Sequence, residues 1–244
     1  MHEHIAKRLS PVIRESLNDK ICGQIKTLIL SKGIEVGQKL PSERVLASQF
    51  QVSRGAVRQA LKSLEQSGYI NIRTGTTGGA FVADNLHLPL FRVTYDLFSA
   101  GQLTLSHFYE ARKAIECISV RLAAQEATPE DIEHLRTLNR KLIEDLDGPA
   151  KLGETRVLEC HAAFHLAMAE ISGNPLIKLI VHSVMALFWV VFTGWSQLDE
   201  RKMSGDAYQR HEEILRAMEA RDLIRCEELM AVDTDWTKTL VLKE

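Results

Sequence analysis

The sequence predicts a mainly α-helical protein of two domains, in which only the smaller N-terminal domain contains β-structure. Three observations lead to this fold class. Apolar residues recur at helical spacing through most of the 244 residues. Two short strand-like segments flank a glycine-rich stretch at 75–79. After the segment 85–90, which contains Pro89, no strand pattern follows. We therefore expect an N-terminal domain at 1–83, a linker at 84–91 and an all-helical domain at 92–244.

The composition is that of an ordinary globular protein, with 45% apolar and 25% charged residues, which argues against disorder. The four cysteines are widely separated and predict free thiols of a reducing compartment, not a disulfide or zinc-finger framework. The N-terminus has no apolar core of a secretion signal. The apolar stretch 176–195 is interrupted by Lys178 and His182, which favours a buried core helix over a membrane span. We expect a cytoplasmic protein without a membrane partner.

Charge is distributed unevenly along the chain. Residues 1–84 contain 12 Lys and Arg against 7 Asp and Glu, whereas the whole chain has a net charge of -2. A basic first third joined to an acidic remainder indicates that contact with a polyanion is confined to the N-terminal domain. A solvated surface can carry the same imbalance.

Three helices are expected in the N-terminal domain. The first spans about 17–31, where apolar residues follow one helical face. Ser42 is placed to cap a short helix that ends near Phe50, and Ser53 is placed to cap a third helix. Two short helices joined by a tight turn form a helix-turn-helix.

The third helix and the hairpin after it carry the residues expected to contact DNA. Arg54 and Arg58 lie one turn apart near the start of the third helix, where they can reach guanine edges or phosphates in a major groove. The strands expected at 69–73 and 80–82 form a β-hairpin wing, whose glycine-rich tip and Arg73 suit a sugar-phosphate backbone. The domain is thus predicted to be a winged helix-turn-helix.

The run LPSERVLASQFQVSRGAVRQALKSLEQSGYINIRTGTTGGAFV resembles the GntR family of bacterial regulators almost position for position. The resemblance implies DNA contacts from three arginines and close approach to the backbone by a serine and two glycines. These residues are Arg44, Arg54, Arg58, Ser53, Gly55 and Gly75. The wing is slightly longer than the usual form, which affects the glycine assignment more than the arginines.

The C-terminal two thirds predict an all-α helical bundle. Proline and glycine mark several helix ends, as in Thr128-Pro129 and Gly173-Asn174-Pro175. Helices are expected at about 92–101, 105–126, 129–147, 153–172, 175–197, 205–220 and 222–242.

Histidines carry the distinctive chemistry of this domain. His161 and His165 lie four residues apart on one helix, so both rings project from the same face. His211 lies on a later helix, and Asp233 faces inward if Leu229, Val232 and Trp236 form the apolar stripe of the last helix. Three imidazoles and a carboxylate would suit Zn²⁺, Ni²⁺, Mn²⁺ or Fe²⁺. Histidines at this spacing also occur by chance, and a buried histidine is often only hydrogen-bonded.

The segments EARKAIECISVRLAA, ATPEDIEHL, FH…SGNP and HEEILRAMEARD resemble the effector domain of the FadR subfamily, called the FCD type. That resemblance implies a metal site in which His165 and His211 match two ligands. His161 replaces the usual Asp and Asp233 the usual His, so the ligand set survives only if the four positions converge. Arg112 matches a position that often faces the effector, where a guanidinium would pair with a carboxylate. A salt bridge is the alternative role of Arg112.

Three functions fit these features. The first is a transcriptional regulator, a homodimer on a palindromic double-stranded operator, controlled by a small organic or sugar acid. The second is a metal-responsive repressor whose effector is the ion itself. The third is a metal-dependent hydrolase, against which the absence of an H-E-x-x-H pattern argues. We expect a regulator and not an enzyme.

Overall fold

A computed structural model describes residues 16–144, 154–193 and 200–241. The chain divides into two compact units, 1–89 and 90–244. The mainly helical fold class is confirmed, because the only paired strands among the described residues form one hairpin in the first unit.

Among its described residues, the first unit contains three helices before its strands, α2 (Leu17–Leu30), α3 (Glu43–Phe50) and α4 (Arg54–Gln66). Each starts at a serine whose hydroxyl accepts a hydrogen bond from a backbone N–H in the first turn. These N-cap residues are Ser16, Ser42 and Ser53. Ser42 and Ser53 therefore start the two helices of the helix-turn-helix, as the sequence predicts.

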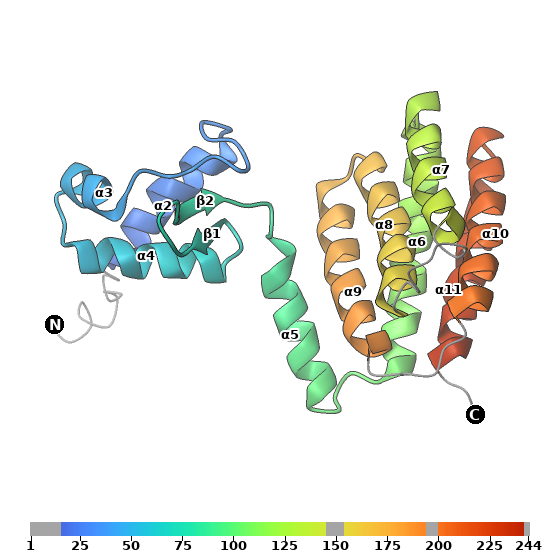
Figure 1. Cartoon of the computed structure of the whole chain (residues 1–244). Coiled ribbons are helices and arrows are strands. Elements are labelled where there is room, and N and C mark those ends of the chain that lie inside the picture. The colour runs from blue at the N-terminus through green and yellow to red at the C-terminus, as the bar shows by residue number, and fades with distance from the viewer. Residues whose placement is uncertain (1–15, 145–153, 194–199, 242–244) are drawn as a thin grey trace, which may run out of the picture. The chain divides into compact units, whose positions relative to one another are not determined.

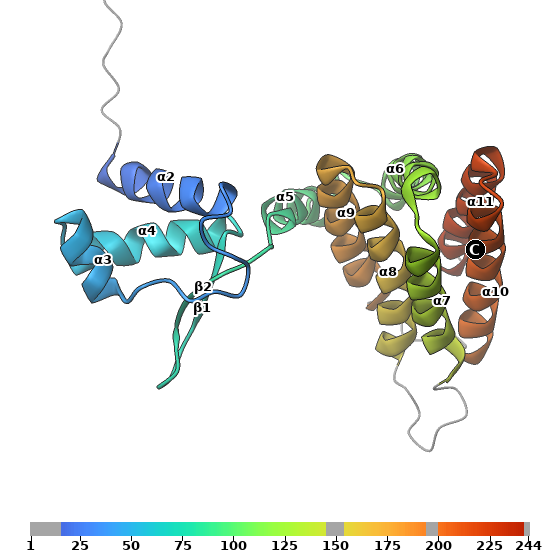
Figure 2. The same cartoon turned by 90° about the horizontal axis from the view of Figure 1, so that it is seen from above.

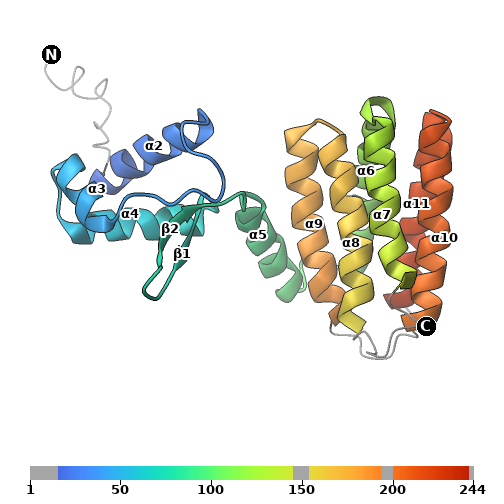
Figure 3. The ribbon, with the colours of Figure 1, turned by 45° about the horizontal axis from the view of Figure 1, so that its top comes forward.

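The wing is an antiparallel pair, β1 (Ile70–Arg73) and β2 (Gly79–Val82), in which Arg73 lies opposite Gly79. Figure 3 shows this hairpin projecting from the three helices. Gly75 has a φ of +100° at the tip, a conformation that favours glycine. Lys39 forms a single bridge to Phe81, which adds the segment before α3 to the wing.

The second unit contains seven helices among its described residues (Figure 1). They are α5 (His87–Ser99), α6 (Leu105–Glu126), α7 (Pro129–Glu144), α8 (Glu154–Ile171), α9 (Pro175–Thr193), α10 (Glu200–Glu219) and α11 (Leu223–Val241). In Figures 2 and 3, α9, α8, α7 and α10 form one row, and α6 and α11 form a second row against it. The parts of the predicted helices at 145–147, 153, 194–197 and 242 lie outside the described residues.

Two helix starts differ from the prediction by more than two residues. Helix α5 begins at His87, inside the expected linker 84–91, because Pro89 lies in its first turn, where a missing N–H leaves no intrahelical hydrogen bond unmade. Helix α10 begins at Glu200 instead of 205.

Helix α9 is long and apolar enough to cross a membrane, the one such helix found among the described residues. Val181, Met185, Phe188 and Phe192 on this helix are buried in the core of the second unit. Length and composition are weak evidence for a membrane span, and the packing of α9 is that of a core helix.

Candidate DNA-binding surface and buried polar cluster

The seven residues predicted to contact DNA all lie exposed on the first unit. Five of them lie on α3, on α4 or at the N-cap of α4. The sixth lies on the strand β1, and the seventh is at the tip of the wing. Val57 and Leu64 on the opposite face of α4 are buried in the core, which fixes this helix with its basic face outward. The arrangement thus leaves the basic face of the recognition helix and the wing accessible to a ligand.

Two glycines of this surface are not required by packing inside the protein. A Cβ built at Gly55 would meet only Ser53 Oγ at 3.8 Å, and one at Gly75 would meet nothing within 4 Å. Gly75 is required by its positive φ, but Gly55 has a helical φ. A close approach from outside, as by a DNA backbone, would explain a glycine at position 55.

One residue of this surface has a defined partner that the sequence did not indicate. Arg58 forms a bidentate ion pair with Glu43 on α3, with Nη2 2.8 Å from Oε2. No spacing rule connects residues 15 apart on two helices, so only the packing of α3 against α4 reveals this pair.

In the second unit, four predicted metal ligands converge. His161 and His165 on α8, His211 on α10 and Asp233 on α11 each offer a ligand atom, and these atoms lie within 4.8 Å of one another. All four residues are buried. Asp233 faces inward as predicted, although Val232, expected in the same apolar stripe, is exposed. The exchange of His and Asp relative to the family pattern therefore preserves a convergent set.

Two polar partners orient the histidines. A carboxylate oxygen of Glu116 on α6 forms an ion pair with Nδ1 of His165. Nδ1 of His211 lies 3.0 Å from Oδ1 of Asn139, whose amide nitrogen donates to the backbone oxygen of Tyr208. Asn139 Oδ1 is therefore an acceptor, and His211 carries its proton on Nδ1. When both rings are neutral, each Nε2 therefore offers a lone pair toward the cluster, the arrangement that metal-binding histidines need.

Several buried polar atoms in this cluster lack a hydrogen-bond partner among the described residues. They include Nε2 of His211 and Oδ1 of Asp233, whereas Nε2 of His165 and Oδ2 of Asp233 lie 3.4 Å apart as an ion pair. Unpaired buried polar atoms are costly, so their concentration at one point calls for a bound group. A cation about 2.1 Å from each ligand holds its ligands at most about 4.2 Å apart, so small side-chain movements would close the site. The donor set fits a divalent transition metal.

In the metal-free protein, a proton supplies part of the positive charge that a metal ion would bring to the cluster. Burial alone would lower the pKa of His165, but Glu116 and Asp233 outweigh burial and raise this pKa to about 9. Burial lowers the pKa of His211 to about 3. Burial also holds the pKa of His161 well below its usual range. One histidine of the three is therefore protonated at neutral pH.

Arg112 is fully buried beside this cluster. Its Nε lies 2.5 Å from Glu116 Oε1, and Nη1 donates to Thr237 Oγ1 at 2.9 Å. Nη2 lies 3.4 Å from Nε2 of His161, and the guanidinium covers the ring of Phe188. The salt bridge that the sequence left open for Arg112 is therefore present, within α6 and in the core. It joins Arg112 through Glu116 to His165.

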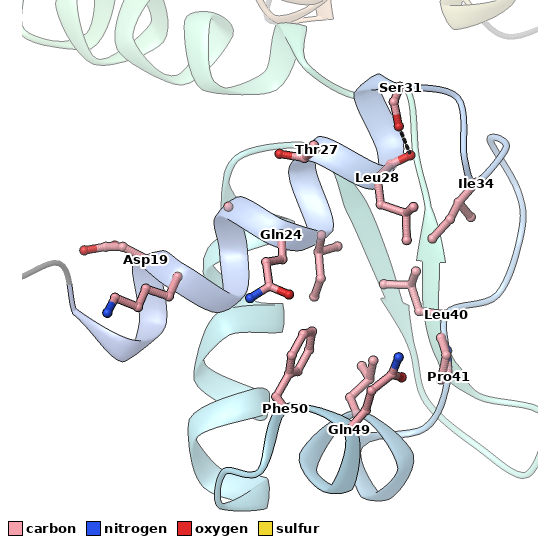
Figure 4. Close-up of a pocket in the computed structure, with 14 residues that line it drawn as sticks. Asp19, Gln24, Thr27, Leu28, Ser31, Ile34, Leu40, Pro41, Gln49 and Phe50 are labelled. Carbon is pink, nitrogen blue, oxygen red and sulfur yellow. Dashed lines mark hydrogen bonds between the residues drawn. The ribbon is translucent and has the colours of Figure 1, made fainter.

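A small cavity adjoins His161, with about 10 Å³ of space, enough for about one water molecule. Its lining is mostly apolar: Val157, Leu158, His161, Phe188, Phe192, Met203, Ala207, Trp236, Thr237 and Leu240. A larger groove of about 800 Å³ lies on the first unit between α2 and α3. In Figure 4, Leu28, Leu40 and Phe50 point into this groove, and no metal-ligating cluster lines it.

Sequence reasoning did not identify Glu43, Glu116 or Asn139. Glu116 had a usable signal, since it lies four residues after Arg112 and this spacing predicts an intrahelical ion pair. The sequence contains no such signal for Asn139 or Glu43, because their partners lie on other helices.

Together, an exposed winged helix-turn-helix and an all-helical domain with a buried polar cluster are typical of a DNA-binding transcriptional regulator. Residues 12–82 match the bacterial regulatory proteins of the gntR family, and residues 107–233 match the FCD domain. The chain belongs to the GntR family, with an FCD domain at its C-terminus, and the resemblance seen in the sequence is confirmed.

Relatives and a solved structure agree with this assignment. The HTH-type transcriptional repressor NanR of Citrobacter rodentium is 30% identical over 88% of this chain and 81% of its own length. NanR of Cronobacter sakazakii is 29% identical over 87% and 80%. A structure of Streptococcus agalactiae GntR has a TM-score of 0.70 at 19% identity, covering 91% of this chain and 98% of that one. These relatives are named as repressors, and this chain is a regulator and not an enzyme.

Proposed function

We propose that this protein is a cytoplasmic repressor whose operator binding is controlled from a divalent metal site in the FCD domain. The main support for this proposal is a set of four buried ligand atoms, contributed by three helices, that lie within 4.8 Å of one another. His161, His165, His211 and Asp233 would hold the ion, and Glu116 and Asn139 would fix the histidine tautomers. Ligand type alone leaves Zn²⁺, Ni²⁺, Mn²⁺ and Fe²⁺ as candidates.

Charge at the site favours an anionic effector. In the metal-free protein, Arg112 and protonated His165 balance Glu116 and Asp233. A divalent ion that displaces the proton of His165 leaves the buried group with one net positive charge. A single carboxylate bound beside the ion and Arg112 would neutralise this charge, which is unfavourable in a buried site.

The lining of the adjoining cavity narrows the chemical class of the effector further. Most of its described lining residues are apolar, Phe188 and Trp236 among them. A carboxylic acid with an apolar body fits this lining better than a sugar acid, whose hydroxyl groups would lack partners there.

The small size of the cavity supports a second candidate function, in which the metal ion is itself the effector. Space for about one water molecule does not accommodate an organic acid unless the surrounding helices move apart. In that case operator binding would respond to the ion alone.

A homodimer on a palindromic double-stranded operator completes the proposal. One winged helix contacts too few base pairs for useful specificity, so two copies are needed. Helix α5 supports this, because Leu90, Val93 and Leu97 are exposed at i, i+3 and i+7 while Phe91 and Phe98 pack against the core. A second apolar face on one helix suits pairing with the same helix of another copy.

The test uses full-length protein and a duplex selected by that protein from randomised DNA. Operator affinity is measured by fluorescence anisotropy in EDTA, in Zn²⁺ or Ni²⁺, and in metal with a panel of aliphatic, aromatic and sugar carboxylates. Weakened binding that needs both metal and an apolar carboxylate supports the proposal. Weakening by metal alone supports the second candidate function. An operator affinity that none of these additions changes would contradict both.

A further inference from the structure

The ion pair between the recognition helix and α3 has a geometry that bears on how DNA sequence is read. Arg58 Nε lies 3.0 Å from Oε1 and 3.2 Å from Oε2 of Glu43, and Nη2 lies 2.8 Å from Oε2. The carboxylate therefore takes the side edge of the guanidinium, formed by Nε and one N–H of Nη2. The end edge, formed by Nη1 and the other N–H of Nη2, is outside this pair. An arginine reads guanine O6 and N7 with two parallel donors of this kind.

The ion pair between Arg58 and Glu43 contributes little to the stability of the fold. The side chains of Arg58 and Glu43 are 61% and 34% exposed, and exposed ion pairs contribute little to folding. Glu43 does lie in the first turn of α3, where a negative charge interacts favourably with the helix dipole. Any acidic residue in that turn would have the same effect without contacting Arg58.

A negative charge on this surface also opposes DNA binding. Every carboxylate near the basic face of α4 repels phosphates and lowers affinity for DNA of any sequence. The flexible side chain of an exposed arginine, however, loses conformational freedom when it binds a base. A partner that already holds the guanidinium in one orientation reduces that loss for the correct base only.

We propose that Glu43 is a positioning residue that holds the end edge of Arg58 toward a guanine, so that it lowers non-specific DNA affinity and raises sequence specificity. The inference rests on the proposed contact of Arg58 with DNA. It assigns to α3 a part in base recognition, although α3 does not itself enter the groove in this type of fold.

The test compares four full-length proteins: wild type, Glu43→Gln, Arg58→Ala and Glu35→Gln. Glu35 is exposed on the same unit, and its replacement is the matched control for loss of one negative charge. Affinity is measured for the duplex selected by the wild type and for a scrambled duplex of equal composition. Each guanine of the selected duplex is also replaced in turn by 7-deazaguanine, which lacks the N7 acceptor.

For Glu43→Gln, we expect tighter binding to the scrambled duplex and weaker binding to the selected duplex, with the ratio of affinities reduced by about tenfold. At the guanine that Arg58 contacts, the loss of affinity caused by 7-deazaguanine should be smaller in Glu43→Gln than in wild type. In Arg58→Ala this loss should be absent. Glu35→Gln should raise affinity for both duplexes equally. Thermal unfolding of each variant reports whether it is folded, and Glu43→Asp offers a second variant in which the shorter carboxylate restores part of the ratio.

Two results would overturn the inference. If Glu43→Gln strengthens binding to both duplexes equally, as Glu35→Gln does, then Glu43 acts only by repulsion. If the 7-deazaguanine penalty is unchanged in Glu43→Gln, then Glu43 does not position Arg58. Failure of the proposed function is distinct, because Arg58→Ala would then retain the wild-type affinity ratio.

Discussion

The two units keep their functional side chains in opposite environments. On the first unit, the arginines expected to contact DNA lie exposed, and the core beneath them is apolar. In the second unit, the candidate ligands and Arg112 are buried among apolar side chains. An exposed functional residue can be replaced with little effect on folding, whereas a buried charged one cannot. Function and stability should therefore separate in the first unit and be coupled in the second.

The largest expected effect on stability comes from the buried pair. Arg112→Ala leaves the buried group of Glu116, Asp233 and protonated His165 with one uncompensated negative charge, so we expect a loss of about 3–5 kcal/mol in the free energy of unfolding. The neighbouring Lys113 forms an exposed pair with Asp235, and Lys113→Ala should cost less than about 1 kcal/mol. Denaturant unfolding of both variants measures the difference. Equal losses for the two would contradict the contrast between buried and exposed charges.

The next effect is the pH dependence of the metal-free protein. Protonated His165, with a pKa of about 9 when folded, stabilises the protein fully below its unfolded pKa of about 6.5, and this contribution is lost as pH rises toward 9. His211, with a pKa of about 3, stays neutral where the unfolded chain accepts a proton, so stability also falls below pH 6.5. As pH rises from 6.5 toward 9, the deprotonation of His165 should lower the free energy of unfolding by up to about 3 kcal/mol.

Thermal unfolding in EDTA between pH 5 and 9 checks this profile. The melting temperature should be highest near pH 6.5. With Zn²⁺ bound, the alkaline loss should disappear, because His165 must give up its proton to bind the ion. A metal-free protein that gains stability from pH 7 to pH 9 would show that His165 is not held as a cation.

On the first unit, the expected effect concerns DNA binding and not folding. Arg58→Ala should weaken binding to the selected operator by about 1–3 kcal/mol while the melting temperature stays near that of the wild type. Anisotropy titrations and thermal unfolding of the same samples measure both quantities. A variant that binds its operator unchanged would mean that α4 is not the recognition helix.

The smallest effect comes from a helix-capping residue that is also predicted to contact DNA. Ser53 Oγ accepts a hydrogen bond from the backbone N–H of Ala56, so Ser53→Ala should cost about 1 kcal/mol of stability. Ser53→Gly should cost only a few tenths, since glycine is a tolerated N-cap. If urea unfolding gave the same stability for wild type and Ser53→Ala, the cap would not contribute as the structure indicates.

Much of this molecule follows from local rules, which is why it could be predicted. Ser42 and Ser53 start helices because their hydroxyls satisfy backbone N–H groups within three residues. His161 and His165 share a face because helical spacing requires it. The helix expected from about residue 92 begins earlier, at His87, because Pro89 suits the first turn of a helix as well as a chain break.

The rest depends on packing between helices, which no single segment encodes. The convergence of His211 and Asp233 on His161 required the arrangement of α8, α10 and α11. Asn139 is recognised as a partner of His211 only once α7 lies beside α10. The apolar stripe expected to include Val232 shows the same limit, since this residue is exposed while Asp233 beside it is buried.

The central proposal is that the buried cluster is a metal site, and elemental analysis tests it directly. Full-length protein would be purified without chelators, exposed to Zn²⁺ or Ni²⁺ and desalted, beside His165→Ala and the control His134→Ala, whose histidine is exposed on α7. We expect about one metal ion per chain in wild type and His134→Ala, and none in His165→Ala. A wild type without metal, or an equal metal content in His165→Ala, would contradict it.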